Sequence, residues 1–430
     1  MVVNAERIAA RVEEQAASTE SVTMDGGALD RPLHICLLGY RSHPYGGGQG
    51  IYIKYLSKAL VQAGHAVDVI SGKPYPHLDP RVRLIKLPGM DLYANGLGSL
   101  RPHHLRSWAN CREWWGKLTG SFSEPLSFGM RVDRYLRKHG QHYDLIHDNQ
   151  CLAYGMLKLQ RRQPLVTTIH HPITSDRDIA LGATDSFWLR LLIRRWYAFL
   201  GMQRRVARRL QHLVTVSATS RRDIAEAFGV PERDVRLVYN GIDTDIFAPR
   251  AGVERRSMRL MATASADAPL KGVRYLLEAF AHLLLRYPDL ELLMVGKPQP
   301  DGETARLVES LGLAPRITFV SGISTEQLVR YYAEATLVVV PSVYEGFGLP
   351  AGEAMACGVP VVICDHRSAY QKALIDVYPV RSMVRNYSGR GGVVPTRVNV
   401  EHAIKGAIER GSMRQHVERH HNVVDIVDRL

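Results

Sequence analysis

Two glutamates, Glu345 and Glu353, bracket a short glycine-rich stretch in PSVYEGFGLPAGE (341–353). The stretch follows an apolar run that ends at Ser342, and Pro350 is typical of the first turn of a helix. Glycines let the backbone approach a ligand closely, and the free N–H groups at a helix start attract an anion such as a diphosphate. The carboxylates on either side can accept hydrogen bonds from sugar hydroxyls. The stretch therefore predicts a cradle for a nucleotide-sugar.

Alternating strands and helices must hold this loop. From residue 33 the chain reads as a strand, LHICLLGY, a glycine loop, RSHPYGGGQG, a helix, IYIKYLSKALVQAG, and a further strand, HAVDVISG. A second cycle opens near residue 258 with MRLMATASA and repeats through TLVVVPS to VPVVIC. Such repetition predicts α/β architecture with parallel sheets and helices on both faces. We expect two Rossmann-like, doubly wound domains that face a central cleft, with ligands at the carboxyl ends of the strands.

The length of 430 residues also favours two domains, because single cores rarely grow that large. We expect a polar leader at 1–30 without stable structure. An N-terminal acceptor-side domain is expected at 31–245, and a C-terminal nucleotide-sugar-binding domain with closing helices at 246–430. The turn-rich segment VYNGIDTDIFAPRAG (238–252) is the predicted hinge between them.

The net charge of +13 is concentrated in FWLRLLIRRWYAFLGMQRRVARRLQHL (187–213), where arginines alternate with aromatic and aliphatic residues at helical spacing. A basic amphipathic helix of this kind suits an anionic membrane surface. The alternative is a surface helix whose apolar stripe lies in the core. All five tryptophans fall between positions 108 and 196, which favours the membrane interpretation. Nucleic-acid-binding signatures are missing from the sequence, so nucleic acid is not an expected partner.

The five cysteines are scattered and include no C-x-x-C pair, which argues against a disulfide framework and against a zinc site. No apolar run reaches the length of a membrane span, and the first 30 residues lack the apolar core of a signal peptide. We therefore expect a cytoplasmic protein, peripheral at the inner face of the membrane, with no bound metal.

The glutamate motif also resembles a known signature. EGFGLPAGE followed by AMACGVPVV is similar to the E-x7-E motif of retaining glycosyltransferases of family 4, which have the GT-B fold. GGGQGIYIKYLSKALVQAGHAVDV, TTIHH, VTVSATSRRDI, VYNGIDTDIF and LKGVRYLLEAF resemble further parts of that family, so the likeness covers about 33–363. It implies transfer of a sugar from a nucleoside diphosphate sugar to an acceptor hydroxyl with retained configuration. A front-face substitution without metal or other cofactor is expected.

The resemblance further implies roles for single residues. As the catalytic pair, Glu345 is expected to contact the donor sugar near the reacting carbon, and His170 to lie beside that sugar, with His171 as the alternative. Lys271 is expected to neutralise the diphosphate leaving group, and Glu353 to bind the ribose diol. The other expected donor contacts come from the backbone of the two glycine loops, namely Gly47, Gly48, Gly346, Phe347, Gly348 and Leu349.

Two departures from the family pattern motivate an alternative. Ala266 stands where the family usually has an arginine five residues before the lysine, and Arg274 is the candidate substitute. Residues 363–389 differ from the Gly-Gly-x-Pro-Glu loop expected there, as a shifted reading frame would produce. The alternative function is a catalytically impaired nucleotide-sugar or glycan-binding protein. A sugar-nucleotide epimerase of the same architecture is disfavoured by the glutamate pair. The sequence leaves the donor and the acceptor open, with acceptor choice expected in N-terminal loops such as 91–117.

Overall fold

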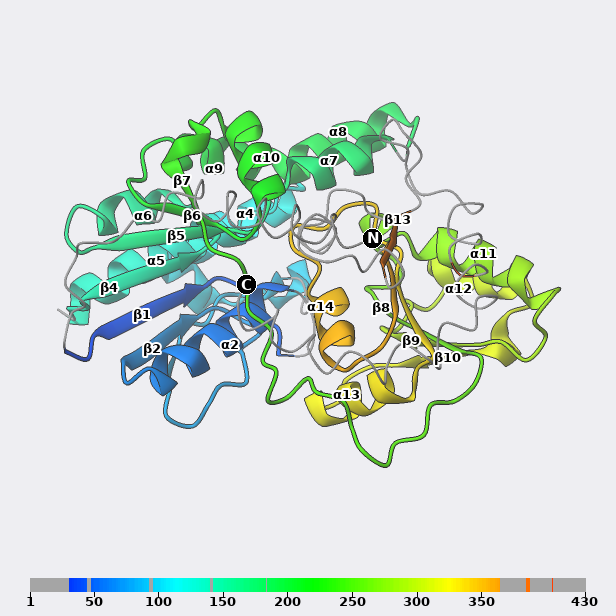
Figure 1. The fold of residues 1–430 in the computed structure, drawn as a ribbon. Coiled ribbons are helices and arrows are strands. Elements are labelled where there is room, and N and C mark those ends of the chain that lie inside the picture. The colour runs from blue at the N-terminus through cyan, green and yellow to red at the C-terminus, as the bar shows by residue number, and fades with distance from the viewer. Residues whose placement is uncertain are drawn as a thin grey trace.

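The computed structural model describes residues 31–44, 48–92, 96–139, 142–182, 184–363, 384–386 and 404. Within them the chain forms two parallel sheets flanked by helices (Figure 1). The leader expected at 1–30, the closing helices apart from Ile404, and most of the atypical segment 363–389 lie outside the described residues.

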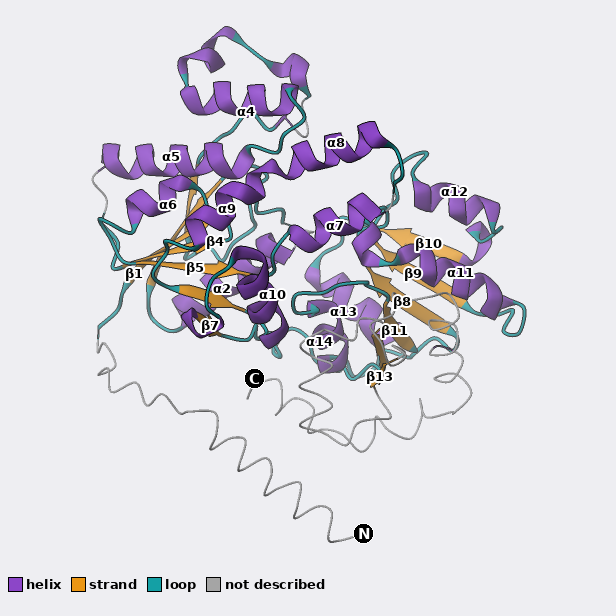
Figure 2. Ribbon diagram, turned by 90° about the horizontal axis from the view of Figure 1, so that it is seen from above, coloured by secondary structure: helices purple, strands orange, loops and turns teal. Residues whose placement is uncertain are grey.

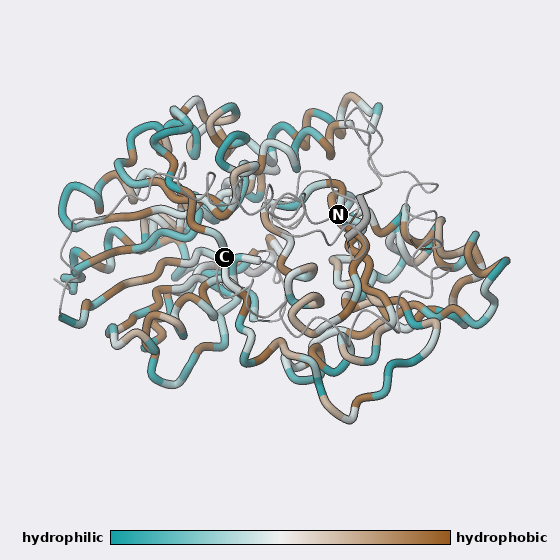
Figure 3. The backbone as a smooth tube through the Cα atoms, viewed as in Figure 1, coloured by the Kyte–Doolittle hydropathy of each residue, from teal (hydrophilic) through white to brown (hydrophobic). Residues whose placement is uncertain are grey.

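The first sheet has seven strands in the order β3-β2-β1-β4-β5-β6-β7, and every neighbouring pair is parallel. Its central strands are buried along nearly their whole length, as expected of a sheet covered on both faces, and Figure 3 shows their apolar character. The strands are β1 (His34–Gly39), β2 (Ala66–Ser71), β3 (Arg83–Lys86), β4 (Leu145–Asn149), β5 (Leu165–Ile169), β6 (Leu213–Thr215) and β7 (Val235–Leu237).

Helices cover both faces of this sheet, and the helix expected after the first glycine loop is α2 (Gly48–Gln62) (Figure 1). The others are α4 (Trp108–Leu118), α5 (Glu124–His139), α6 (Tyr154–Leu159), α7 (Thr174–Gly182), α8 (Phe187–Trp196), α9 (Leu200–Ala207) and α10 (Ala218–Phe228). Short 3-10 turns are η1 (Leu97–Ser99), η2 (Pro102–Arg106), η3 (Tyr197–Phe199) and η4 (Glu232–Asp234).

The second sheet has six parallel strands in the order β10-β9-β8-β11-β12-β13. Its strands are β8 (Arg259–Thr263), β9 (Glu291–Val295), β10 (Ile317–Val320), β11 (Leu337–Val340), β12 (Val361–Ile363) and β13 (Val384–Asn386). Its helices are α11 (Val273–Leu284), α12 (Glu303–Ser310), α13 (Thr325–Glu334) and α14 (Leu349–Ala356), with the turns η5 (Pro269–Lys271) and η6 (Ala314–Arg316). The strands predicted at MRLMATASA, TLVVVPS and VPVVIC are confirmed as β8, β11 and β12.

Each sheet reverses its strand order at one place. In the first sheet β1 lies between β2 and β4, and in the second sheet β8 lies between β9 and β11. In open parallel sheets such reversal points open a crevice at the carboxyl ends of the two strands, where ligands bind. We therefore expect a ligand site at the loops that follow β1, β4, β8 and β11.

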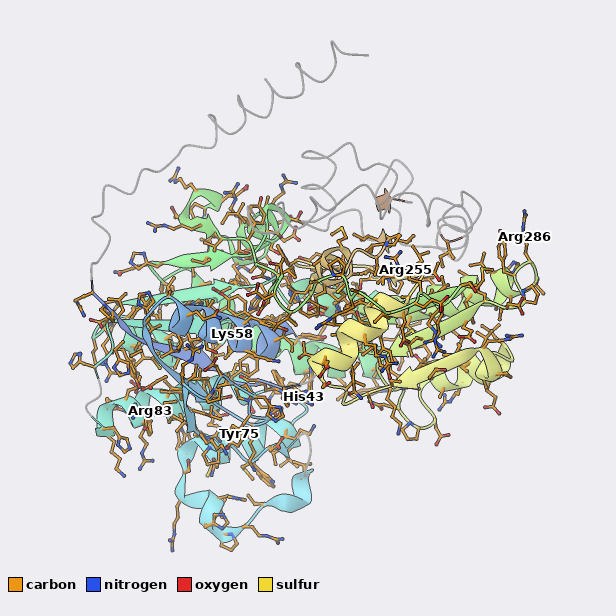
Figure 4. The ribbon with its side chains drawn as sticks, turned by 60° about the horizontal axis from the view of Figure 1, so that its bottom comes forward. His43, Lys58, Tyr75, Arg83, Arg255 and Arg286 are labelled. Atoms are coloured by element: carbon orange, nitrogen blue, oxygen red, sulfur yellow. The ribbon has the colours of Figure 1, made fainter. Side chains whose placement is uncertain are left out.

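Several contacts join the two halves of the chain. Lys58 on α2, labelled in Figure 4, donates to Asp243 of the connecting segment at 2.7 Å. On the same helix, Lys54 donates to Thr325 of α13 at 3.2 Å. Val216, which follows β6, lies in the apolar cluster that is built mainly from second-sheet residues. The halves therefore share both polar contacts and part of a core.

The single basic helix predicted at 187–213 is wrong in its extent. The chain forms α8, the turn η3 and α9, and residue 213 already belongs to β6. Phe122 explains the break, because its backbone N–H donates to the Trp196 carbonyl and its ring contacts Trp196 and Phe199. No residue of α8 is buried, whereas most of α9 is. The interpretation as a surface helix with its apolar side in the core therefore holds for α9, and α8 is exposed.

Candidate functional site

The loop between β11 and α14 carries Glu345. Its Oε1 atom accepts a hydrogen bond from Ser342 Oγ at 2.7 Å and lies 2.6 Å from Lys271 Nζ. Both members of this ion pair are largely covered, with 12% of the glutamate side chain and 29% of the lysine side chain exposed. The loop thus holds a carboxylate and a cation in direct contact at the carboxyl edge of the second sheet.

Lys271 reaches this position because its own loop is pinned to the β11 loop. Val343 N–H donates to the Leu270 carbonyl at 2.9 Å. Gly272, the N-cap residue before α11, has φ 62° in the left-handed region, and a Cβ there would lie 2.0 Å from the Pro341 carbonyl oxygen. Only glycine tolerates that conformation and that approach together. The KG pair of the sequence therefore has a packing reason beside the charge of its lysine.

Glu353 lies within α14, and its side chain is turned into the protein. Tyr332 OH donates to Glu353 Oε2 at 3.0 Å. Burial raises the pKa of this carboxyl group from 4.5 to about 7, while the tyrosine hydrogen bond acts in the opposite direction. A ligand hydroxyl that reaches Glu353 would therefore meet a group that is part ionised at neutral pH.

His170 follows β5 and is held from two sides by the β4 loop. Its Nε2 lies 2.6 Å from Asn149 Oδ1, and its backbone N–H donates to Gln150 Oε1 at 2.8 Å. Because an amide oxygen only accepts, Nε2 carries the proton in this arrangement. Burial, followed by the charges of His171 and His147, lowers the pKa of His170 to about 3. The imidazole is therefore neutral at neutral pH.

The loop that follows β4 has an unusual backbone conformation. Gln150 and Leu152 have φ angles of 54° and 50°, in the left-handed region that non-glycine residues seldom adopt. The buried Asp148 carboxylate fixes them by accepting from the N–H groups of Cys151 and Leu152. Strain of this kind persists where the surroundings over-determine it and is frequent at functional sites.

The two sheets bring His170 and Glu345 into one neighbourhood. A Cβ at Gly346 would lie 2.9 Å from the carbonyl oxygen of His170, so the two loops touch. The ring of His171 lies 5.7 Å from that of Tyr344, the residue before Glu345. The candidate catalytic pair therefore lies on facing loops, one from each sheet.

Helix α10 secures the same loop from the side of the first sheet. Ser220 Oγ donates to the Gly346 carbonyl at 3.2 Å, and Tyr344 OH donates to Asp223 Oδ2 at 2.7 Å. Sequence reasoning missed Ser220, Asp223 and the pair Asn149 and Gln150. The available signals were the likeness of VTVSATSRRDI, which contains Ser220 and Asp223, to the family, and the position of Asn149 and Gln150 at the carboxyl end of β4.

The remaining predicted residues lie in or beside the two glycine loops. Gly48 begins α2, whereas Gly47 lies outside the described residues. Gly348, the N-cap residue before α14, has φ 88° in the left-handed region. The Phe347 side chain is buried in the core cluster and Leu349 packs against that cluster. Because the Phe347 side chain is buried, a contact of that residue with a ligand would come from its backbone.

Ala266, which stands at the position of the family's usual arginine, is buried. Ala266 is 5% exposed, and its carbonyl oxygen accepts from Thr304 Oγ1 at 2.7 Å. The candidate substitute, Arg274, pairs with Glu278 at 2.9 Å on α11 and leaves 64% of its side chain exposed. Within the described residues, Lys271 is the cation in contact with Glu345.

The described part of the chain contains no group of three or more histidine, cysteine or acidic side chains that could hold a metal ion. Its four cysteines are free thiols. None of its helices is long and apolar enough to cross a lipid bilayer.

Comparison with known proteins gives consistent matches over most of the chain. The family described as Glycosyltransferase Family 4 matches residues 46–246, and that described as Glycosyl transferases group 1 matches 251–409. The MMP alpha-(1->4)-mannosyltransferase of Mycolicibacterium hassiacum is 44% identical over 334 residues, which are 77% of this chain and 80% of that protein. The D-inositol 3-phosphate glycosyltransferase of Geodermatophilus obscurus is 29% identical, over 74% and 70% of the two chains.

Solved structures share the fold at lower identity. Sucrose-phosphate synthase from Thermosynechococcus elongatus superimposes with a TM-score of 0.65 and 22% identity, covering 93% of this chain and 95% of that one. Anabaena Alr3699/HepE in complex with UDP and glucose gives 0.61 and 18%, covering 92% and 95%. These matches confirm the GT-B architecture with two Rossmann-like domains.

Proposed function

Because the chain belongs to glycosyltransferase family 4, we propose that it transfers a sugar from a nucleoside diphosphate sugar to an acceptor hydroxyl with retained anomeric configuration. The 44% identical relative is named as an α-(1→4)-mannosyltransferase, which makes mannose the first sugar to test. A nucleotide-sugar donor is supported by the HepE structure, whose fold this chain shares and which was solved with UDP and glucose.

The contact between Lys271 and Glu345 carries this proposal. The Nζ and Oε1 atoms are 2.6 Å apart, on loops that follow β8 and β11 at the reversal point of the second sheet. A diphosphate brings negative charge that competes for the lysine. When Lys271 turns to the phosphates, the Glu345 carboxylate can accept hydrogen bonds from the donor sugar.

In the proposed step, the bond between the anomeric carbon and the diphosphate oxygen breaks. The acceptor oxygen bonds to that carbon on the same face, and its proton passes to the leaving diphosphate oxygen. Lys271 offsets the negative charge that develops on the leaving group, an effect that is largest in a water-poor site. No nucleophilic carboxylate and no metal ion are required.

His170 acts in this scheme as a neutral, positioned group. Its Nε2–H is occupied by Asn149, so the group offered by the ring is the unprotonated Nδ1, together with the backbone carbonyl that approaches Gly346. Glu353 would accept from the ribose diol, and the amides of 346–349 would face the sugar and phosphate. We keep Gly47 and Gly48 as donor contacts from the opposite loop.

The test is thermal unfolding with and without millimolar UDP, GDP, ADP and their common sugar conjugates. A ligand at a hundredfold its Kd should stabilise the folded state by about 2.7 kcal/mol, equivalent to roughly several degrees in Tm. Lys271→Met serves as the control and should lose most of that shift. A melt that none of these nucleotides moves would overturn the donor proposal.

The second candidate is a nucleotide-sugar or glycan-binding protein with impaired catalysis. It is favoured by Ala266, whose buried position leaves no room for the usual arginine, and by the unusual sequence of 363–389. Release of free nucleoside diphosphate from the donor distinguishes the two. Binding without release over a day, by coupled assay, would favour the binding protein.

We also propose the domain division and the compartment. The boundary is placed at 245/246, in the connecting segment between β7 and β8, with acceptor recognition assigned to 31–245 and donor recognition to 246–430. Nucleotide-sugars and free thiols both fit a cytoplasmic protein.

A peripheral position on the inner face of the membrane is supported by helix α8. Phe187 and Trp188 are 69% and 72% exposed, and Arg194 and Arg195 lie exposed in the last turn of the helix. Aromatic and basic side chains together suit the anionic interface of a bilayer. Helix α4, which stands out from the first half of the chain in Figure 2, carries two further exposed tryptophans, Trp108 and Trp115.

Flotation with vesicles of anionic and of neutral lipid tests this association. The double variant Trp188→Ser with Arg194→Gln should lose most binding to anionic vesicles. Leu285→Ser is the control, because Leu285 is 83% exposed on the other half of the chain. Equal binding of the double variant and the wild type would remove the membrane from the proposal.

A further inference from the structure

A pocket of about 490 Å³ lies between α7, α9 and α10, in the half of the chain built on the first sheet. Neither Lys271 nor Glu353 lines it. Its walls include Pro172, Thr174, Arg204, Asp223, Glu226 and Phe228. The volume is of the order of small-ligand sites, which start near 300 Å³.

The pocket is next to the candidate catalytic loops. Asp223, one of its wall residues, accepts the hydrogen bond from Tyr344 OH at 2.7 Å, and Tyr344 directly precedes Glu345. Pro172, another wall residue, follows His170 and His171 along the chain. A molecule held in the pocket would therefore have one end at the place where the two loops meet.

The lining suits a molecule with many hydroxyl groups. Ala227 offers a small apolar surface and Thr174 and Ser175 offer hydroxyls, whereas Leu200 and Phe228 are only 5% and 1% exposed. Arg177 is paired with Asp178 at 2.8 Å. A sugar ring combines apolar faces with hydroxyls that both donate and accept, so this mixture matches its chemistry.

The charges of the lining select against anions. Two arginines face three carboxylates in the wall, so negative charge is in excess. In the described part of the chain, neither Arg204 nor Glu226 has a side-chain hydrogen bond or ion pair, so both are available to a ligand. A phosphorylated ligand would meet repulsion here, whereas a neutral sugar would find both a donor and an acceptor.

We propose that this pocket binds a neutral sugar residue of the acceptor, and so places the acceptor hydroxyl beside Glu345 and His170. The inference rests on the proposed glycosyltransferase function and adds the class and location of the acceptor. That sugar can belong to a soluble oligosaccharide or to the head of a glycolipid, and its recognition chemistry is the same in both.

Gly201 gives a direct way to fill the pocket. It is the second residue of α9, it lines the pocket, and a Cβ added there would meet no heavy atom within 4 Å. Gly201→Leu therefore projects into the open space without a clash and favours the helix. Gly182→Leu is the matched control, since Gly182 ends α7, also has open space around it and does not line the pocket.

The probes are α-(1→4)-linked mannotetraose, the same glycan on a lipid in neutral vesicles, and inositol 3-phosphate. Binding is measured by titration calorimetry or saturation-transfer NMR, in the presence of the nucleotide that stabilises the protein most. We expect wild type and Gly182→Leu to bind a mannotetraose probe equally, and Gly201→Leu to bind it at least tenfold more weakly. Glu226→Gln should give a smaller loss in the same direction.

The outcomes separate this proposal from the donor proposal. An unchanged nucleotide shift in Tm for Gly201→Leu shows that the fold and the donor site are intact. Binding of the lipid-borne glycan but not of the soluble one supports the acceptor proposal and identifies a glycolipid as the source of the sugar. Three outcomes would each overturn the acceptor proposal. They are equal glycan binding by Gly201→Leu and wild type, no binding of either glycan probe to the wild type, and inositol 3-phosphate binding that Gly201→Leu abolishes. Failure of the donor proposal is recognised separately, because in that case no nucleotide changes the Tm of the wild type.

Discussion

Burial of Glu353 predicts a stability change with pH that one variant can isolate. Burial raises the pKa of this carboxyl group from 4.5 to about 7 in the folded chain. Between these values the folded state holds a proton that the unfolded state has lost. Stability therefore falls as pH rises through this window, because the unfolded state ionises first.

The size of the effect follows from the two pKa values. Between pH 4.5 and pH 7, each pH unit lowers the free energy of unfolding by about 1.4 kcal/mol, so the whole window lowers it by about 3 kcal/mol. Below pH 4.5 the cost of burying the charge is absent, and above pH 7 it is complete. Glu353→Gln stays neutral at every pH and keeps an oxygen that can accept from Tyr332 OH. The variant should therefore match wild type at pH 4.5 and exceed it by about 3 kcal/mol at pH 8.

Urea unfolding followed by circular dichroism at 222 nm, at half-unit steps between pH 4.5 and pH 8, measures this difference. Tryptophan fluorescence is unsuitable, because all five tryptophans lie between positions 108 and 196 and report on the other half of the chain. Asp148, whose pKa burial also raises to about 7, adds a slope in the same window. That slope is common to wild type and variant and cancels in their difference. A difference that stays constant from pH 4.5 to pH 8 would refute the reasoning.

Three further outcomes test the site. Lys271→Met should lower kcat by about 10²- to 10³-fold, because the charge on the leaving group loses its partner; kcat within threefold of wild type would contradict this role. His170→Asn should lower kcat by a factor that is constant from pH 5 to pH 8, since burial lowers the His170 pKa to about 3 and its charge does not change there; a ratio that varies tenfold over that range would contradict it. Gly346→Ala places a Cβ 2.9 Å from the His170 carbonyl oxygen, so the loop must shift and kcat/KM should fall about ten- to hundredfold, with unchanged Tm as the control for folding.

The elements that carry the site were predictable because each has a strong local signal. The run TLVVVPS is apolar throughout, as in a strand covered on both faces, and it forms β11. Pro350 and Gly358 mark the two ends of the next helix, and the structure has α14 at Leu349–Ala356. The positions of Glu345 in a loop and Glu353 in a helix follow directly from these signals.

The contacts between distant parts of the chain were not predictable in the same way. Ser220 and Gly346 are 126 residues apart, and neither residue type signals a partner. Asn149 and Gln150 hold His170 by hydrogen bonds, and Gln150 has a left-handed backbone although it is not a glycine. The break at η3 was missed for a related reason, because the packing of Phe122 against Trp196 ends α8, and no proline or glycine lies within α8 or η3.

Helix α10 touches the catalytic loop through Ser220 and Asp223 and lines the pocket through Asp223 and Glu226. These residues are spaced by three, so they advance around the helix by only about 60° per step and share one broad side of it. A residue inserted near Ser217 would rotate everything after it by about 100° and carry both sets of contacts away together. Relatives that keep both contacts should therefore vary in the composition of this helix but not in its length.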